Sequence, residues 1–330
     1  MSDLVVTHPG AVAIREGISL GEVLQVYLDR LSAEGTRRVY DTAVREAFAW
    51  WGIEGVNDVA PGNLASYRAH LVQRTRRKAN DPLSPASVAL KLSALRGFFV
   101  FCRLTGVTAM SREVVNFTLA GYTSRVVKPY EILSEEEQRR LLDHLRSSHA
   151  MQAERDYPLI SLMLATGLRA AEVTVLQLRD IRIDADGDWS VHVRQGKGRK
   201  DRMVPLSAGM RKTLQDWLRQ SGREMSQQED TGSFLFWGGS GLDSPMTTRR
   251  LQQIVKRAAR DAGITSKVIT PHSLRHTMAM RVLSSGASVI TVQKLLGHAS
   301  VQTTQKYLDH LDWRELKRWA VELPNEEASE

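Results

Sequence analysis

The sequence predicts a mainly α-helical fold of two domains with one small antiparallel β-sheet. The chain has 330 residues, which is long enough for two domains of ordinary size. Apolar residues recur at spacings of three and four through most of the chain, which is the pattern of amphipathic helices. Alternation of apolar and polar residues around glycine-containing turns is persuasive only in residues 181–206, which indicates a three-stranded antiparallel sheet.

The domain boundaries follow from changes in this pattern along the chain. Residues 1–17 carry little pattern, and we expect a flexible arm there, with no strand in the first third of the chain. Residues 18–119 are predicted to form a domain of four or five helices. Residues 120–130 contain glycine, serine and proline and are predicted to be a linker. A second domain is expected over 131–310, followed by a tail helix over 311–330.

Capping residues mark the helices of the first domain. Ser19 is a suitable N-cap for the first helix, and Gly52 is placed to end the second. The fourth helix is predicted to begin with Ser84 as N-cap and Pro85 in its first turn, and Gly106 follows its end. These signals place helices on both sides of the basic segment described below.

Similar signals order the second domain. Ser134 and Glu137 form a capping box at the start of one helix, and a largely apolar helix ends at Gly167. After the sheet, helices are predicted over 207–221 and 247–263. The second of these is expected to bury one apolar face, made of Leu251, Ile254, Val255, Ala258 and Ala259.

The charge balance indicates an anionic partner. Lys and Arg total 45 against 37 for Asp and Glu, so the net charge is +8, and nucleic acid is the commonest such partner. Basic or polar residues cluster on three helices, where they are either DNA contacts or solvated helix faces. The candidates for DNA contact are Arg74, Arg76, Arg77 and Lys78, then Ser87, Lys91 and Arg96, and finally Arg249, Arg250, Lys256 and Arg257.

The remaining composition favours a cytoplasmic protein. The single cysteine, Cys102, excludes intrachain disulfides and lies in an apolar run, so we expect a buried structural thiol. No stretch approaches 18 consecutive apolar residues, so no membrane span is expected. The N-terminus lacks the basic and apolar regions of a secretory signal.

Residues suited to phosphate chemistry stand at helix starts and turns of the second domain. The segment "PHSLRH" places His272, Arg275 and His276 on one face of a helix. Arg169 lies just past the end of the apolar helix, and Glu172, three residues on, can hold its guanidinium. Guanidinium groups stay charged at any working pH and can bind two phosphate oxygens at once.

These residues and three others resemble the motifs of the tyrosine recombinase, or phage integrase, family. Its pattern is present in order as "TGLRAAE", "GKG", "HSLRH", "LGH" and a following tyrosine. The second motif brings Lys197 into the set, the fourth brings His298, and the fifth brings Tyr307. The resemblance covers residues 130–315 and is weaker over the first domain, which is similar to the family's SAM-like, DNA-clamping domain.

The resemblance implies a mixed α/β catalytic domain that cleaves and rejoins DNA through a 3′-phosphotyrosyl intermediate. Tyr307 would be the nucleophile, and it needs help because a free tyrosine has a pKa of about 10. Arg169 and Arg275 would stabilise the phosphate charge, with Glu172 and His276 in support. His272 would be the general base, Lys197 the acid for the leaving 5′ oxygen, and His298 a further phosphate contact. Neither metal nor other cofactor is expected.

The implied partners are a double-stranded DNA recombination site and three further copies of the chain, with four protomers on two sites. The tail over 311–330 has apolar residues with no evident place in its own domain, so it either docks on a neighbouring copy or folds back. Accessory proteins are open as further partners, and no membrane is expected. Three alternatives remain: an inactive DNA-binding regulator on this fold, a type IB-like nicking–closing topoisomerase, and a His-ligated metal hydrolase.

Overall fold

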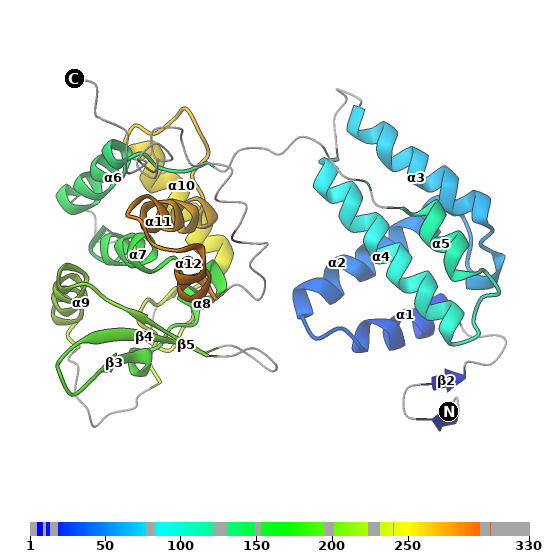
Figure 1. Cartoon of the computed structure of the whole chain (residues 1–330), viewed down its shortest axis with the longest axis horizontal. Helices are drawn as coiled ribbons and strands as arrows, with labels where there is room; N and C mark the ends of the chain where they lie inside the picture. Colours follow the sequence, from blue (N-terminus) through cyan, green and yellow to red (C-terminus); the bar gives the residue numbers. More distant parts are fainter. Residues whose placement is uncertain are drawn as a thin grey trace, which may run out of the picture. The chain divides into compact units, whose positions relative to one another are not determined.

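The computed structural model describes residues 19–76, 83–120, 122, 131–148, 153–194, 201–223, 232–239, 241–297 and 304, together with two short strands near the N-terminus (Figure 1). Of residues 74–76 and 153 it describes the backbone alone. The chain divides into two compact units, Met1–Val127 and Lys128–Glu330. Most of the predicted linker and all of the predicted tail lie outside the described residues, so the domain limits stay predictions.

The first unit is helical, as predicted. Its helices are α1 (Leu20–Asp29), α2 (Glu34–Trp51), α3 (Pro61–Arg76), α4 (Pro85–Leu104) and α5 (Arg112–Thr118), with a 3₁₀ turn at Val56–Asp58. The caps fall where the sequence predicts them. Ser19 and Glu22 form a capping box, Ser84 caps α4, and Gly52 ends α2 in the left-handed conformation.

The core of this unit is built around aromatic side chains. The rings of Phe48, Phe98 and Phe99 lie within 6.1 Å of one another, and all three residues are buried. Helix α4 is long and apolar enough to cross a membrane, but it fills the core with eight buried residues. One of them is Cys102, which confirms a buried thiol, and burial raises its pKa.

The expectation that the first third of the chain contains no strand is wrong at the N-terminus, whereas the arm over residues 1–17 stays a prediction. Strands β1 (Val5–His8) and β2 (Ala11–Ala13) pair antiparallel. The sequence signal for them is short: Val5 and Val6 precede Pro9–Gly10, a dipeptide typical of turns, and Val12 follows it. Strands of three and four residues are too brief to show a periodic pattern, which is why alternation alone does not reveal them.

The second unit contains the predicted sheet within a set of helices. In chain order these are α6 (Glu135–Ser147), α7 (Ala153–Thr166), α8 (Ala170–Thr174), a 3₁₀ turn (Leu178–Asp180), β3 (Ile181–Ile183), β4 (Trp189–Val193), β5 (Arg202–Pro205), α9 (Ala208–Gln220), α10 (Thr248–Asp261), α11 (Pro271–Ser284) and α12 (Val289–Leu296). The three strands are antiparallel in the order β3-β4-β5, which confirms the predicted sheet.

Helix α7 is the centre of the second unit. It contacts α6, α9 and α11, and Leu159, Ile160, Leu162 and Met163 on it are fully buried (Figure 1). Helix α10 buries the five apolar residues expected of it and has the most pronounced amphipathic pattern of the described helices. Burial of these faces fixes the helix ends, because a packed helix cannot slide along its axis without opening voids.

Several of these ends converge on one place. Helix α7 ends at Gly167, α12 ends at Gly297, α8 begins after Arg169, and β5 lies beside α12. The turn at Gly167 requires glycine for two reasons. Its φ is +64°, and an added Cβ would lie 2.7 Å from Leu296 Cδ2 and 3.0 Å from Met278 Sδ. The close approach of α12 and α11 to this turn is what brings the site residues together.

Candidate active site

Arg169 is held at the start of α8 by its own capping box. Its backbone N–H donates to Glu172 Oε2 at 2.7 Å, and its Nη1 donates to Glu172 Oε1 at 2.8 Å. Its Nη2 donates to the carbonyl of Gly297 at 3.1 Å. The side chain is 34% exposed, so one part of the guanidinium is fixed while another part faces solvent. The contact between Glu172 and Arg169 is thus present in the structure.

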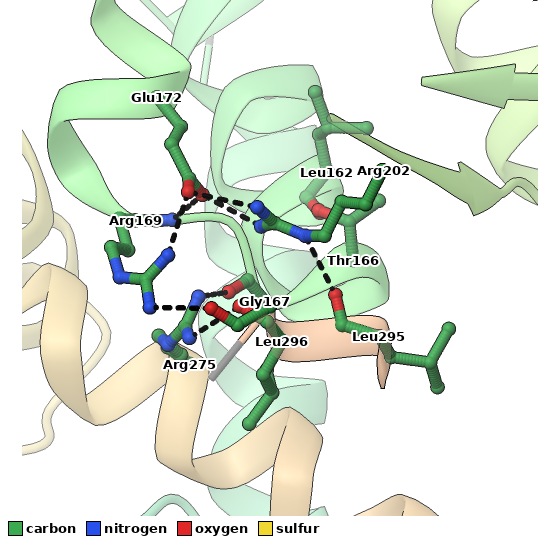
Figure 2. A network of polar contacts seen from close by, with 10 residues as sticks. Leu162, Thr166, Gly167, Arg169, Glu172, Arg202, Arg275, Leu295 and Leu296 are labelled. Carbon is green, nitrogen blue, oxygen red and sulfur yellow. Dashed lines mark hydrogen bonds and ion pairs between the residues drawn. The ribbon is translucent and has the colours of Figure 1, made fainter. Parts of the chain in front are cut away.

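Arg275 projects from α11 into the same place and is almost completely buried, with 2% of its surface exposed. Its Nη1 donates to the carbonyl of Gly167 at 2.6 Å and its Nη2 to that of Leu296 at 2.8 Å. A buried guanidinium needs such acceptors, since an unpaired buried charge is very costly. Gly167 and α12 therefore position both arginines, and Figure 2 shows their guanidinium groups side by side.

Glu172 is the carboxylate at the centre of this network. Its two oxygens accept bonds from Arg169 and also from Arg202, which lies on β5. Burial alone would raise the pKa of Glu172, but the hydrogen bonds and charges of Arg202 and Arg169 outweigh burial and lower it to about 2. The carboxylate is therefore ionised at any physiological pH.

His272 and His276 lie one turn apart at the start of α11. Their ring centroids are 4.1 Å apart in an edge-to-face arrangement, with His272 at the surface and His276 buried. Loss of hydration lowers the pKa of His272, and the positive charges of Arg275 and Arg169 lower it further. The neutral imidazole that results is the form able to accept a proton.

The other predicted catalytic residues lie outside the described part of the chain. These are Lys197, His298 and Tyr307. The described residues border two of them: β4 and β5 bound the loop that contains Lys197, and Gly297 directly precedes His298. In the parts of the chain that the structure describes, no group of three or more His, Cys, Asp or Glu side chains could hold a metal ion.

The predicted DNA-contact residues differ in how far they are free to bind DNA. Lys91 forms an ion pair with Glu46, and Arg257 donates to the buried carboxylate of Asp156 at 2.8 Å. Ser87 shares a hydrogen bond with the N-cap Ser84. The others in the described residues are Arg96 and Arg250, which are partly buried, and Arg249 and Lys256, which are exposed. Arg77, Lys78 and the side chains of Arg74 and Arg76 lie outside the described residues, and all these contacts stay predictions.

The fold and the paired arginines define a two-domain chain of the tyrosine recombinase class. A profile of the "Phage integrase family" matches residues 131–314, and one of the "Phage integrase, N-terminal SAM-like domain" matches residues 24–106. The chain therefore belongs to the phage integrase family.

Curated relatives and solved structures agree with this assignment. The chain is 27% identical over 289 residues to "Tyrosine recombinase XerC" of Listeria monocytogenes serotype 4b (strain F2365), covering 85% of this chain and 90% of that protein. It is 32% identical over 233 residues to "Tyrosine recombinase" of Pseudothermotoga lettingae, covering 70% and 73%. The fold is similar to that of the Tn1549 transposon integrase in complex with transposon right end DNA, at 17% identity with a TM-score of 0.69, covering 90% of this chain and 98% of that one.

Proposed function

We propose that the protein is a site-specific DNA recombinase that cleaves and rejoins strands through a 3′-phosphotyrosyl intermediate. The observation that carries the proposal is the placement of Arg169 and Arg275 around one turn, with the surface imidazole of His272 beside them. Two permanent positive charges at one point suit a phosphodiester, whose negative charge grows when it is attacked.

In the proposed reaction, the Tyr307 oxygen attacks the scissile phosphorus while His272 accepts the phenolic proton. The bond from phosphorus to the 5′ oxygen breaks, and Lys197 gives that oxygen a proton. The products are a 3′-phosphotyrosyl bond and a free 5′-hydroxyl. Rejoining is the reverse, with a 5′-hydroxyl of another strand as the nucleophile, so phosphate bond energy is conserved and no ATP is needed. Arg169 and Arg275 stabilise the phosphate oxygens in both directions, and His298 supplies a further hydrogen bond.

A structural relative that binds DNA supports a DNA partner. One relative in fold is described as XerH bound to palindromic difH substrate in a post-cleavage complex, at 24% identity and a TM-score of 0.62, covering 79% of this chain and 72% of that one. By extension, we propose that this chain acts on a double-stranded recombination site as a tetramer across two sites, in the cytoplasm. The tail over 311–330 is the proposed contact between protomers.

The test is a trapping experiment in the presence of EDTA. Sequences that the protein binds are first selected from a random DNA library, and a nicked duplex of the selected sequence is then incubated with the protein. A nick near the cleavage site lets the short 5′-hydroxyl strand diffuse away, so the covalent adduct accumulates. We expect an adduct from the wild type and none from Tyr307→Phe, with DNA binding unchanged.

The outcomes separate the alternatives. No adduct from the wild type on any selected sequence would point to a binding regulator. An adduct that persists in Tyr307→Phe would exclude this tyrosine as the nucleophile. Relaxation of supercoiled DNA without exchange between two sites would indicate a nicking–closing enzyme. Activity that EDTA abolishes would indicate a metal-dependent hydrolase.

A further inference from the structure

We propose that Arg202, on β5, is a positioning residue for the cleavage reaction: it fixes Arg169 through Glu172 and fixes the end of α12, although it does not itself hold the phosphate. The inference rests on the proposed function, since positioning matters only if Arg169 acts on a phosphate. It concerns a residue that none of the family motifs in the sequence includes.

The side chain of Arg202 is fully committed to two partners. Its Nη1 and Nη2 donate to the two oxygens of Glu172 at 3.0 and 2.8 Å, which is a bidentate ion pair. Its Nε donates to the carbonyl of Leu295 at 2.9 Å. Only 8% of the side chain is exposed, against 34% for Arg169. All three guanidinium nitrogens of Arg202 thus donate to Glu172 or Leu295, which assigns Arg202 to positioning rather than to the phosphate.

Through Glu172, Arg202 restrains Arg169. Glu172 Oε1 accepts from both Arg169 Nη1 and Arg202 Nη1, and Oε2 accepts from Arg202 Nη2 and from the backbone of Arg169 (Figure 2). The bidentate pair fixes the plane of the carboxylate, because both oxygens must face the guanidinium fork. Without it, Glu172 can turn about its side-chain bonds, and Arg169 then loses its fixed acceptor.

The second role of Arg202 is at the end of α12. The carbonyls of Leu295, Leu296 and Gly297 are consecutive, and each accepts from a different arginine: Arg202, Arg275 and Arg169 in that order. The last carbonyls of a helix have no intrahelical donors and carry the negative end of the helix dipole, so they are suited to cations. Arg202 is therefore one of three anchors at the point where the chain leads into His298.

Arg202 also connects this frame to the sheet. It pairs with Val193 across β4 and β5, and the loop that contains Lys197 lies between these two strands. One side chain thus links the hairpin, the start of α8 and the end of α12. A hydrophobic pair of similar volume often replaces a buried ion pair without loss of stability, so stability alone does not require an arginine with these partners.

The experiment compares Arg202→Met with Arg194→Met as a matched control. Arg194 also lies next to the Lys197 loop and forms an ion pair with a buried carboxylate, at 2.7 Å from Asp180. Within the part of the chain that the structure describes, its hydrogen bonds go to Asp180 and Gln177 and not to Arg169 or α12. Both variants are expected to lower the melting temperature and to bind DNA. Cleavage of the nicked substrate is then measured in single turnover, at a temperature where both variants are folded. A misplaced catalytic group typically costs about a hundredfold in rate, so we expect that loss in Arg202→Met and none in Arg194→Met.

A modified substrate reports whether Arg202 acts through the stabilisation of the phosphate charge, in which Arg169 is proposed to take part. A methylphosphonate at the scissile position replaces one charged oxygen with a methyl group, so less charge needs stabilisation. The loss in Arg202→Met, relative to wild type, should become about tenfold or less on this substrate. The double variant Arg202→Met, Glu172→Gln should cleave DNA no more slowly than the slower of the two single variants. Both substitutions break the same contact, the ion pair between Arg202 and Glu172.

Several results would overturn the inference. Cleavage by Arg202→Met at the rate of Arg194→Met would show a purely structural role, and an equal loss on both substrates would show that Arg169 is not the residue affected. If Arg202→Met does not fold, Arg202→Lys replaces it, because lysine keeps the charge but cannot make all three contacts, and wild-type cleavage by that variant would contradict the proposal. A wild-type chain that forms no adduct would instead refute the proposed function itself.

Discussion

The two units of the molecule differ in where their charged side chains lie. In the N-terminal unit the core is apolar and aromatic, and ion pairs such as Arg38–Glu34 lie on the surface of α2, with both side chains more than three-quarters exposed. In the C-terminal unit Arg202–Glu172 is an interior pair, and Arg275 is buried at the same place. Surface pairs contribute little to stability, whereas breaking an interior pair leaves an uncompensated charge. Among the described residues, the charged side chains that are buried all belong to the C-terminal unit, and one of them, Arg275, lies where the chemistry is proposed; the others are Asp156, Asp180 and Arg223.

The largest expected difference between variants of the two units is in the rate of DNA cleavage. Arg169→Ala and Arg275→Ala should each lower the rate of adduct formation by at least about a hundred- to a thousandfold, because in the proposed reaction each arginine stabilises the developing negative charge. Arg38→Ala, which breaks the exposed pair on α2, should leave the rate unchanged. Single-turnover cleavage with DNA binding measured in parallel checks this. Near-normal cleavage by either of the first two variants would contradict their role at the phosphate.

A second contrast concerns stability. Glu172→Gln should destabilise the C-terminal unit by about 3 to 5 kcal/mol, because two cations lose their shared carboxylate. Glu34→Gln, at the exposed pair, should have no measurable effect. Chemical denaturation of the full chain, with tryptophan fluorescence as the signal, measures both. Equal stability of the two variants would show that the interior network does not stabilise the unit.

The pH dependence follows from the same carboxylate. The pKa of Glu172 is about 2 in the folded chain against an ordinary value of 4.5, so the ionised form is favoured by folding. Its contribution to stability is complete above pH 4.5 and is lost as the pH falls from 4.5 toward 2. Acid unfolding of the wild type should therefore be steeper over that range than acid unfolding of Glu172→Gln.

The smallest contrast compares two glycines that end helices. Gly52 and Gly167 both have φ near +65°, but a Cβ at Gly52 would meet open space, and one at Gly167 would meet Leu296 and Met278. Gly52→Ala should cost about 1 to 2 kcal/mol for the left-handed backbone alone. Gly167→Ala should cost about 1 to 3 kcal/mol more through overpacking, and it alone should slow cleavage. Equal losses of stability in both variants would show that the turn at Gly167 has room to adjust.

Local patterns in the sequence were enough to predict most of the fold. Helices with clear caps, such as the one after Ser19 and the one after Ser134, occur where predicted, because caps and apolar periodicity are both local properties. The antiparallel sheet was also predicted, since its alternation extends across three strands. The β1–β2 hairpin was not, because seven residues of strand are too few to show a period.

The sequence predicted only those site residues that lie within recognisable motifs. Arg169, Glu172 and Arg275 stand within recognisable segments, but Arg202 follows the charged run "GKGRKD" and looks like one more solvated cation. Its partners are 30 and 93 residues away, and only the folded chain brings them together. For the same reason the sequence could not show that Lys91 pairs with Glu46 or that Arg257 pairs with Asp156.

The three arginines at the end of α12 bind backbone oxygens, and this affects which sequence changes the site can tolerate. A substitution at Leu295 leaves its carbonyl in place, so the hydrogen bond itself is indifferent to the side chain. A one-residue insertion or deletion inside α12 is different, because each residue turns the helix by about 100°. It would redirect all three carbonyls together. The hydrogen bonds at this helix end therefore tolerate a change of side chain at Leu295, but they do not tolerate a change in the length of α12.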